Sequence, residues 1–119
     1  MKNTFSYTSL LGVSTLIGCG AVSSNARNES TTAAIRAAEE VGAQSVPRAA
    51  LHLQMAKEES EQAKALTAKG EKEEAQSLLL RAEADANLAV MLSREDAERT
   101  ESANALKRVQ AQRSGNLID

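Results

Sequence analysis

The chain has 119 residues, which is enough for one domain and leaves little for a second. Aromatic residues make up 2% of the chain, and both of them, Phe5 and Tyr7, precede residue 20, so neither an aromatic stacking platform nor a deep ligand pocket is expected after it. The 14 basic and 16 acidic residues give a net charge of −2 and form no basic face, which argues against nucleic-acid binding. The apolar residues are mostly Ala, and a composition rich in Ala, Glu, Lys, Leu and Arg is typical of long helices and coiled coils.

Residues 1–18 have the features of a secretory signal peptide. One early cation, Lys2, precedes an apolar stretch that is too short and too polar to span a bilayer permanently. The last three residues of this segment together with the next one, Leu16-Ile17-Gly18-Cys19, resemble the bacterial lipoprotein box. In that family the signal is cut before the Cys, whose sulfur carries diacylglycerol and whose new amine is acylated, for example with palmitate. The resemblance implies that Cys19 is a lipidation site, and the alternative is an ordinary signal or a buried thiol.

Cys19 is the only cysteine, so an exported chain has no partner for an internal disulfide, whereas a thioether would account for the lone sulfur. Several acyl chains hold a protein firmly, since each buried CH₂ contributes about 0.8 kcal/mol. Gly20, where some Gram-negative lipoproteins have Asp, implies by the same resemblance a place in the outer membrane, facing the periplasm. Residues 19–30 are otherwise small and polar, which predicts a flexible tether.

Residues 31–113 are expected to form one helical domain, followed by a disordered tail over 114–119. A first helix is predicted to start near Ser30–Thr32, where a hydroxyl can cap the free amides, and to end at Gly42. Pro47 suits the first turn of a second helix, which runs to about Lys69. The apolar face of the first helix comprises Ala34, Ile35, Ala38 and Val41, and the seam of the second comprises Ala49, Leu53, Ala56, Ser60, Ala63 and Thr67.

Gly70 is predicted to end the second helix, and acidic residues over 71–74 suit the positive end of a third helix dipole. No Gly or Pro interrupts the chain from Glu71 to Ser114, so this helix can run for about forty residues, or ~60 Å. Its inner face is expected to comprise Ala75, Leu78, Leu79, Ala82, Ala86, Ala89 and Leu92.

Helix lengths predict an all-α fold in the form of a long antiparallel helical hairpin. The second helix matches the third only as far as Ser93, so residues 94–113 overhang. If the first helix continues in line with the second after a break at Gly42–Pro47, Ile35 meets the Ala105–Leu106 region and covers the overhang. The alternative is a compact three-helix bundle, in which the first helix folds back and the overhang stays bare.

These landmarks resemble the domain of unknown function 4398 family of Ala-rich bacterial envelope lipoproteins. The family pattern is an Ala-rich helix ending in Glu and Gly-Ala, then Pro, an Ala seam, a Gly turn and an Ala/Leu helix. Here it appears over residues 37–43, at Pro47, from Leu53 to Ala56, at Gly70 and over 75–89. Ser60 departs from the pattern, since the family has a bulky Leu there. The resemblance implies a fold and an envelope location, because the family has no settled activity.

No residue pattern predicts catalysis, a cofactor, a metal site or a small-molecule substrate. His52 is the only histidine, and zinc requires several converging ligands, so a place on the surface or at the edge of the seam is expected. Acidic residues could pair across the hairpin, but the Glu-x-x-His motifs of di-metal bundles are absent and basic neighbours favour a solvated charged face. These acidic residues are Glu58, Glu59, Glu61, Glu73, Glu74, Glu83 and Asp85.

Two functions remain open at this level. The first is a non-enzymatic envelope lipoprotein, anchored through its N-terminal lipid, whose helical rod binds another envelope protein or a second copy of itself. Leu106 and Val109 on the overhang motivate this hypothesis. The alternative is a small periplasmic adaptor similar to tetratricopeptide units, which share the helix-turn-helix form, although the aromatic positions of such repeats are empty here.

Overall fold

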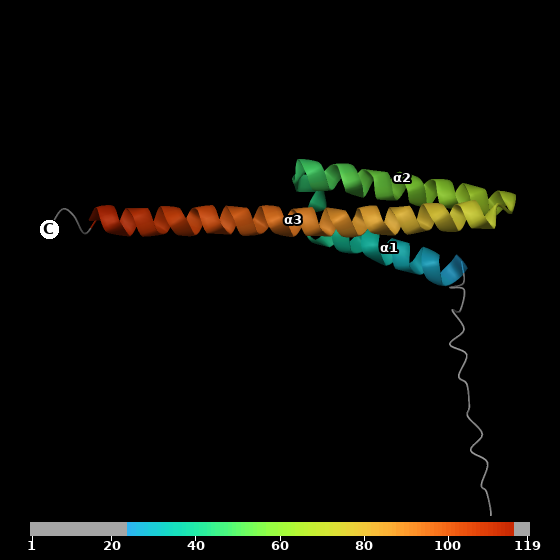
Figure 1. The fold of residues 1–119 in the computed structure, drawn as a ribbon, viewed down its shortest axis with the longest axis horizontal. Helices are drawn as coiled ribbons and strands as arrows, with labels where there is room; N and C mark the ends of the chain where they lie inside the picture. Colours follow the sequence, from blue (N-terminus) through green and yellow to red (C-terminus); the bar gives the residue numbers. More distant parts are fainter. Residues whose placement is uncertain (1–23, 116–119) are drawn as a thin grey trace, which may run out of the picture.

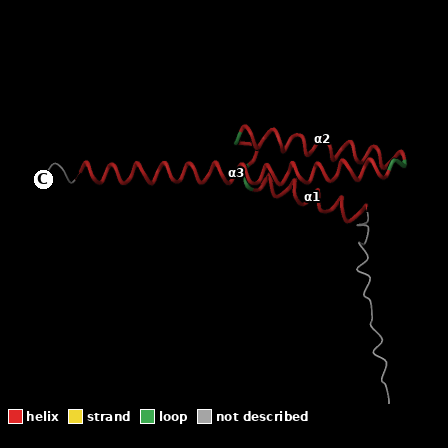
Figure 2. Tube along the Cα trace, in the orientation of Figure 1, coloured by secondary structure: helices red, strands yellow, loops and turns green. Residues whose placement is uncertain are grey.

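The computed structural model describes residues 24–115, and this part of the chain consists of helices and short turns without a strand. Four elements follow one another: α1 (Ser24–Glu40), the 3₁₀ turn η1 (Ala43–Ser45), α2 (Pro47–Lys69) and α3 (Lys72–Gly115). The predicted all-α class is therefore confirmed. Figure 2 shows how short the connections between the helices are. The proposed signal peptide, Cys19 and residues 116–119 lie outside the described residues.

Helices α2 and α3 form the predicted antiparallel pair, joined by a tight turn at Gly70. Gly70 adopts a left-handed conformation with φ of 85°. Its N–H donates to the carbonyl of Thr67, and the N–H of Glu71 donates to the carbonyl of Leu66, which gives two of the free carbonyls at the end of α2 a partner. Glu73 and Glu74 lie in the first turn of α3, as expected for negative charge at a helix N-terminus.

Helix α1 folds back along the first half of α3, so its expected position in line with α2 was wrong and the three-helix bundle is observed. In Figure 1, α1 and α2 flank the same half of α3, and the red half of α3 extends alone. The hydroxyl of Thr31 lies 3.1 Å from the carbonyl oxygen of Leu79, and that of Ser30 donates to Glu83 at 2.8 Å. Ile35 packs near Ala89 instead of the Ala105–Leu106 region.

The reversal between α1 and α2 has a local cause in the segment from Gly42 to Val46. Gly42 has a positive φ of 75°, which a residue with a side chain rarely adopts, and its N–H donates to the carbonyl of Glu39. The 3₁₀ turn follows, and Val46 is extended, as the residue before a proline prefers. A left-handed residue followed by a turn reverses the chain, whereas a proline kink alone would only have bent it.

Two helix ends differ from the prediction. Helix α1 starts at Ser24 instead of near Ser30–Thr32, so the second half of the expected tether is helical. Helix α3 includes Ser114 and Gly115, which were assigned to the tail, and the Ser114 hydroxyl bonds back to the carbonyl of Gln110 at 2.8 Å. Thr31 does not cap the helix but is buried inside the bundle.

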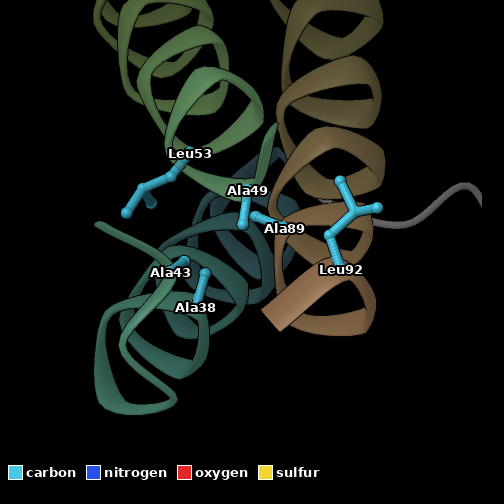
Figure 3. Packing of buried hydrophobic residues seen from close by; sticks show 6 residues of the cluster. All are labelled: Ala38, Ala43, Ala49, Leu53, Ala89 and Leu92. Atoms are coloured by element: carbon cyan, nitrogen blue, oxygen red, sulfur yellow. The ribbon is translucent and has the colours of Figure 1, made fainter. Parts of the chain in front are cut away.

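Small side chains make up most of the bundle core. Five of the six predicted seam positions of α2 are buried, and the sixth, Thr67, is exposed. On the predicted inner face of α3, every residue is buried except Leu78, which is half-buried. Figure 3 shows the larger of two apolar clusters, to which all four elements contribute. It comprises Ala38, Ala43, Ala49, Leu53, Ala89 and Leu92, and the smaller one, near the Gly70 turn, comprises Ala63, Ala75 and Leu79.

Candidate functional site

A polar network crosses the α2–α3 interface between the two apolar clusters. Nδ1 of His52 lies 2.8 Å from a carboxylate oxygen of Asp85, so His52 occupies the predicted edge of the seam. One carboxylate oxygen of Glu59 lies 2.7 Å from a guanidinium nitrogen of Arg81. The other oxygen of Glu59 is buried without a hydrogen-bond partner. The network therefore ties α2 to α3.

Glu59 departs from the expected solvated acidic face, because its side chain is only 9% exposed. Burial raises the pKa of its carboxyl group, since the charged form is poorly hydrated there. The positive charge of Arg81 opposes this increase, and the nearby Asp85 carboxylate adds to it. A carboxyl group with a raised pKa occurs both in active sites and in structural ion-pair networks, and the helix-to-helix bonds here fit a structural role.

Elsewhere the charged face matches the prediction. Lys57 pairs with Glu39 of α1 at 2.5 Å, and Lys64 pairs with Glu61 within α2 at 2.6 Å. The first pair is about 40% exposed and the second is more than half exposed, so water screens both and each contributes little to stability. Within residues 24–115, no group of three or more His, Cys, Asp or Glu side chains is arranged to hold a metal ion.

The second half of α3 is the largest surface without a neighbour in the described structure. We call residues 94–115 the arm, and Figure 1 shows it extending beyond the ends of α1 and α2. Leu106 is 65% exposed and Val109 is 44% exposed. The overhang that the lengths of the second and third helices predicted is thus present, and the first helix does not cover it.

The base of the arm meets the start of α2 in a small cleft. Its volume is about 60 Å³. Val46, just before α2, and Arg48, in the first turn of α2, line one side, and the residues of α3 that line the other side are Leu92, Glu95, Asp96 and Arg99. The cleft shows which face of the arm continues in line with α2. On that face the arm has the charged residues Asp96 and Arg99, whereas the part of α3 that packs against α1 and α2, residues 72–93, has mostly Ala and Leu at its inward positions.

Three buried polar residues, Thr31, Glu59 and Ser93, are not recognised as interior positions from the sequence. Thr31 lies four residues before Ile35 and seven before Ala38, so helical spacing on that stripe could have placed it inside. Glu59 lies between Ala56 and Ala63, next to Ser60, and its side chain is buried at the contact with α3, where Arg81 pairs with it.

Neither the family models, nor the curated proteins, nor the solved structures with which the chain was compared gave a match. The resemblance to the family of Ala-rich envelope lipoproteins therefore stays a prediction. No helix within residues 24–115 combines the length and apolar character needed to cross a membrane. Cys19, the one residue predicted to carry a modification, lies outside the described part of the chain.

Proposed function

We propose that the protein is a lipid-anchored bacterial envelope protein whose three-helix bundle presents an exposed helical arm for binding another protein. The observation that carries the proposal is the arm itself, because a rigid helix without a covering neighbour offers a long surface to a partner. The lipoprotein box at Leu16–Cys19 supports the anchor, and Gly20 favours the outer membrane, facing the periplasm.

The anchor and the arm would lie at opposite ends of the molecule. Helix α1 begins beside the Gly70 turn, since Asn25 and Asn28 line the same cleft as Thr67 and Lys72. Ser24 follows Cys19 by only five positions, and a chain of that length reaches about 18 Å at most. From Lys72 the 44 residues of α3 run for about 66 Å away from that end. An acylated Cys19 would thus lie at the end of the bundle that is remote from the arm.

The anchor is tested by expressing the full chain and its Cys19→Ser variant in a Gram-negative bacterium, with Ser24→Ala as the matched control. We expect mass spectrometry to find acyl chains on Cys19 of the wild type, and both the wild type and Ser24→Ala in the membrane fraction. Cys19→Ser should lose the acyl chains. An unacylated wild-type protein would contradict the anchor without bearing on the arm.

A further inference from the structure

We propose that the partner of the arm is the arm of a second copy of this chain, paired in antiparallel orientation. This inference rests on the part of the proposed function that makes the arm a binding surface, and it does not depend on the lipid anchor. Three independent features of the arm lead to it: the distribution of charge, the residues on one face and the position of α2.

Charge changes sign along the arm. Residues 94–101 contain two basic and four acidic side chains, a net charge of −2, whereas residues 102–115 contain three basic side chains and none that is acidic, a net charge of +3. An antiparallel pair places the negative half of each arm beside the positive half of the other. A parallel pair places like charges side by side along its whole length.

One face of the arm has the spacing of a coiled-coil seam. Steps of three and four residues from Leu92 run along this face through Asp96, Arg99, Ala103, Leu106, Gln110 and Arg113. Val109 flanks the seam, and outward positions such as Glu98, Glu101 and Arg108 are charged. The cleft at the base of the arm is lined by Leu92, Asp96 and Arg99, so the seam faces along the line of α2.

Full overlap of the two arms fixes the register. If Arg94 of one copy lies opposite Gly115 of the other, paired residue numbers sum to 209. Leu106 then lies opposite Ala103, Arg99 opposite Gln110, and Asp96 opposite Arg113, each pair occurring twice around the two-fold axis. The register that fills the bare length of α3 is therefore also the one that pairs a large apolar residue with a small one and an acid with a base.

The position of α2 excludes the parallel arrangement on this face. Helix α2 packs on α3 up to Leu92, so a parallel partner in register would bring its own α2 into the same space. In the antiparallel pair the C-terminal end of each arm reaches only the base of the other, where Arg48 lies beside the cleft and suits the negative end of a helix dipole. The two bundles then lie at opposite ends of the dimer.

The pairing is weak, because the seam contains only Leu106, Ala103 and the flanking Val109 as apolar residues. We expect a dissociation constant between about 10 µM and 1 mM, in the range of transient encounters. Confinement of the copies to one compartment would raise their effective concentration. Sedimentation equilibrium of residues 20–119, which contain every described helix, should show a monomer–dimer equilibrium in this range. A monomer at ~1 mM would overturn the proposal.

Matched variants separate this interface from other modes of association. Leu106→Gln should abolish dimers, whereas Leu51→Gln should not, because Leu51 is similarly exposed, at 60%, on the outer surface of α2. Asp96→Arg and Arg113→Asp should each weaken dimerisation about tenfold, and the double variant should restore it. Equal weakening by Leu51→Gln, or no rescue in the double variant, would overturn the arm-to-arm pairing.

Disulfide crosslinking tests the orientation, since residues 20–119 contain no cysteine. Arg99→Cys and Gln110→Cys variants are mixed and oxidised with copper phenanthroline. Antiparallel pairing predicts disulfides only between the two different variants, because identical positions lie about 16 Å apart along the axis. Disulfides between identical variants would establish a parallel pair. If neither kind of disulfide formed at a concentration where dimers are present, the contact would lie elsewhere on the molecule. Both results would contradict the proposal.

Discussion

The two halves of α3 share one continuous helix but have opposite surroundings. In the bundle half, seven residues are buried against α1 and α2, from Ala75 to Ser93. In the arm no residue is buried. The bundle half carries Ala and Leu at its inward positions, and the same face of the arm carries Asp96 and Arg99. Burial thus ends at the point where the inward-facing residues change from apolar to charged, although the helix itself continues beyond that point.

This difference shows that a helix can persist without a covering neighbour once it has been started elsewhere. Nucleation is the costly step of helix formation, and the packed half of α3 supplies the nucleus. Each further residue of the arm then adds a backbone hydrogen bond, and side-chain pairs such as Glu95–Arg99, at 2.5 Å, add a little more. We therefore expect the bundle to tolerate changes in the arm, but the arm to depend on the bundle.

The largest contrast should come from enlarging an alanine. Ala86 is fully buried in the α3 seam, and Ala86→Leu would force the helices apart at a cost of about 3 kcal/mol in the free energy of unfolding. The same change at the exposed Ala111 should alter this free energy by less than about 0.5 kcal/mol. Urea unfolding followed by circular dichroism measures both, and similar values for the two variants would contradict the assignment of the core.

Glycine-to-alanine changes compare a turn with a helix end. Gly70→Ala introduces a side chain at a φ of 85°, and this conformation costs an L-residue about 1–2 kcal/mol even though no neighbouring atom obstructs the new Cβ. Gly115, at the end of the arm, has no positive φ. We expect thermal unfolding to occur at a lower temperature for Gly70→Ala and at an unchanged temperature for Gly115→Ala.

Threonine-to-valine changes compare a buried hydroxyl with an exposed one. The Thr31 hydroxyl lies between the carbonyl oxygens of Arg27 and Leu79, at 3.0 and 3.1 Å, so Thr31→Val removes the α1–α3 hydrogen bond and costs about 1 kcal/mol. Thr100 is exposed on the arm, and Thr100→Val should have no measurable effect on chemical denaturation. A neutral Thr31→Val would mean that the contact does not help to hold α1.

The pH dependence of stability should differ between Glu59 and an arm carboxylate. Because burial raises the pKa of Glu59 in the folded state, the folded protein binds more protons than the unfolded chain from about pH 4.3 up to the raised pKa. Its contribution to stability therefore falls as pH rises through this window. Relative to the wild type, Glu59→Gln should gain stability as pH rises, and Glu98→Gln on the arm should run parallel to the wild type.

Removal of the arm should have the smallest effect on stability. A chain that ends at Ser93 keeps every buried residue of the described structure, so its temperature of unfolding should match that of the full-length protein, while its total helix signal decreases. A large loss of stability would show that the arm contributes to the bundle, and the separation between the two halves of α3 would then be wrong.

The breaks between the helices and the positions on the seam could be predicted from the sequence, because both depend on residues that are close together in the chain. Gly42, Pro47 and Gly70 mark the breaks, and alanines at helical spacing mark the seam. The direction of α1 could not be predicted, since it depends on the left-handed Gly42 and the turn after it, and a small Ala seam fits two partners nearly equally well. The burial of Glu59 could not be predicted, because it depends on the contact with Arg81 and Asp85 of the facing helix α3, which are far from Glu59 in the sequence.

Amide hydrogen exchange read by mass spectrometry tests the division of α3 into a packed half and a bare half most directly. At a concentration where the protein is monomeric, we predict slow exchange over residues 75–93 and fast exchange over residues 94–115. Protection of the arm should then rise with concentration as copies pair, without a change over residues 75–93. Equal protection of both halves in the dilute monomer would contradict the account.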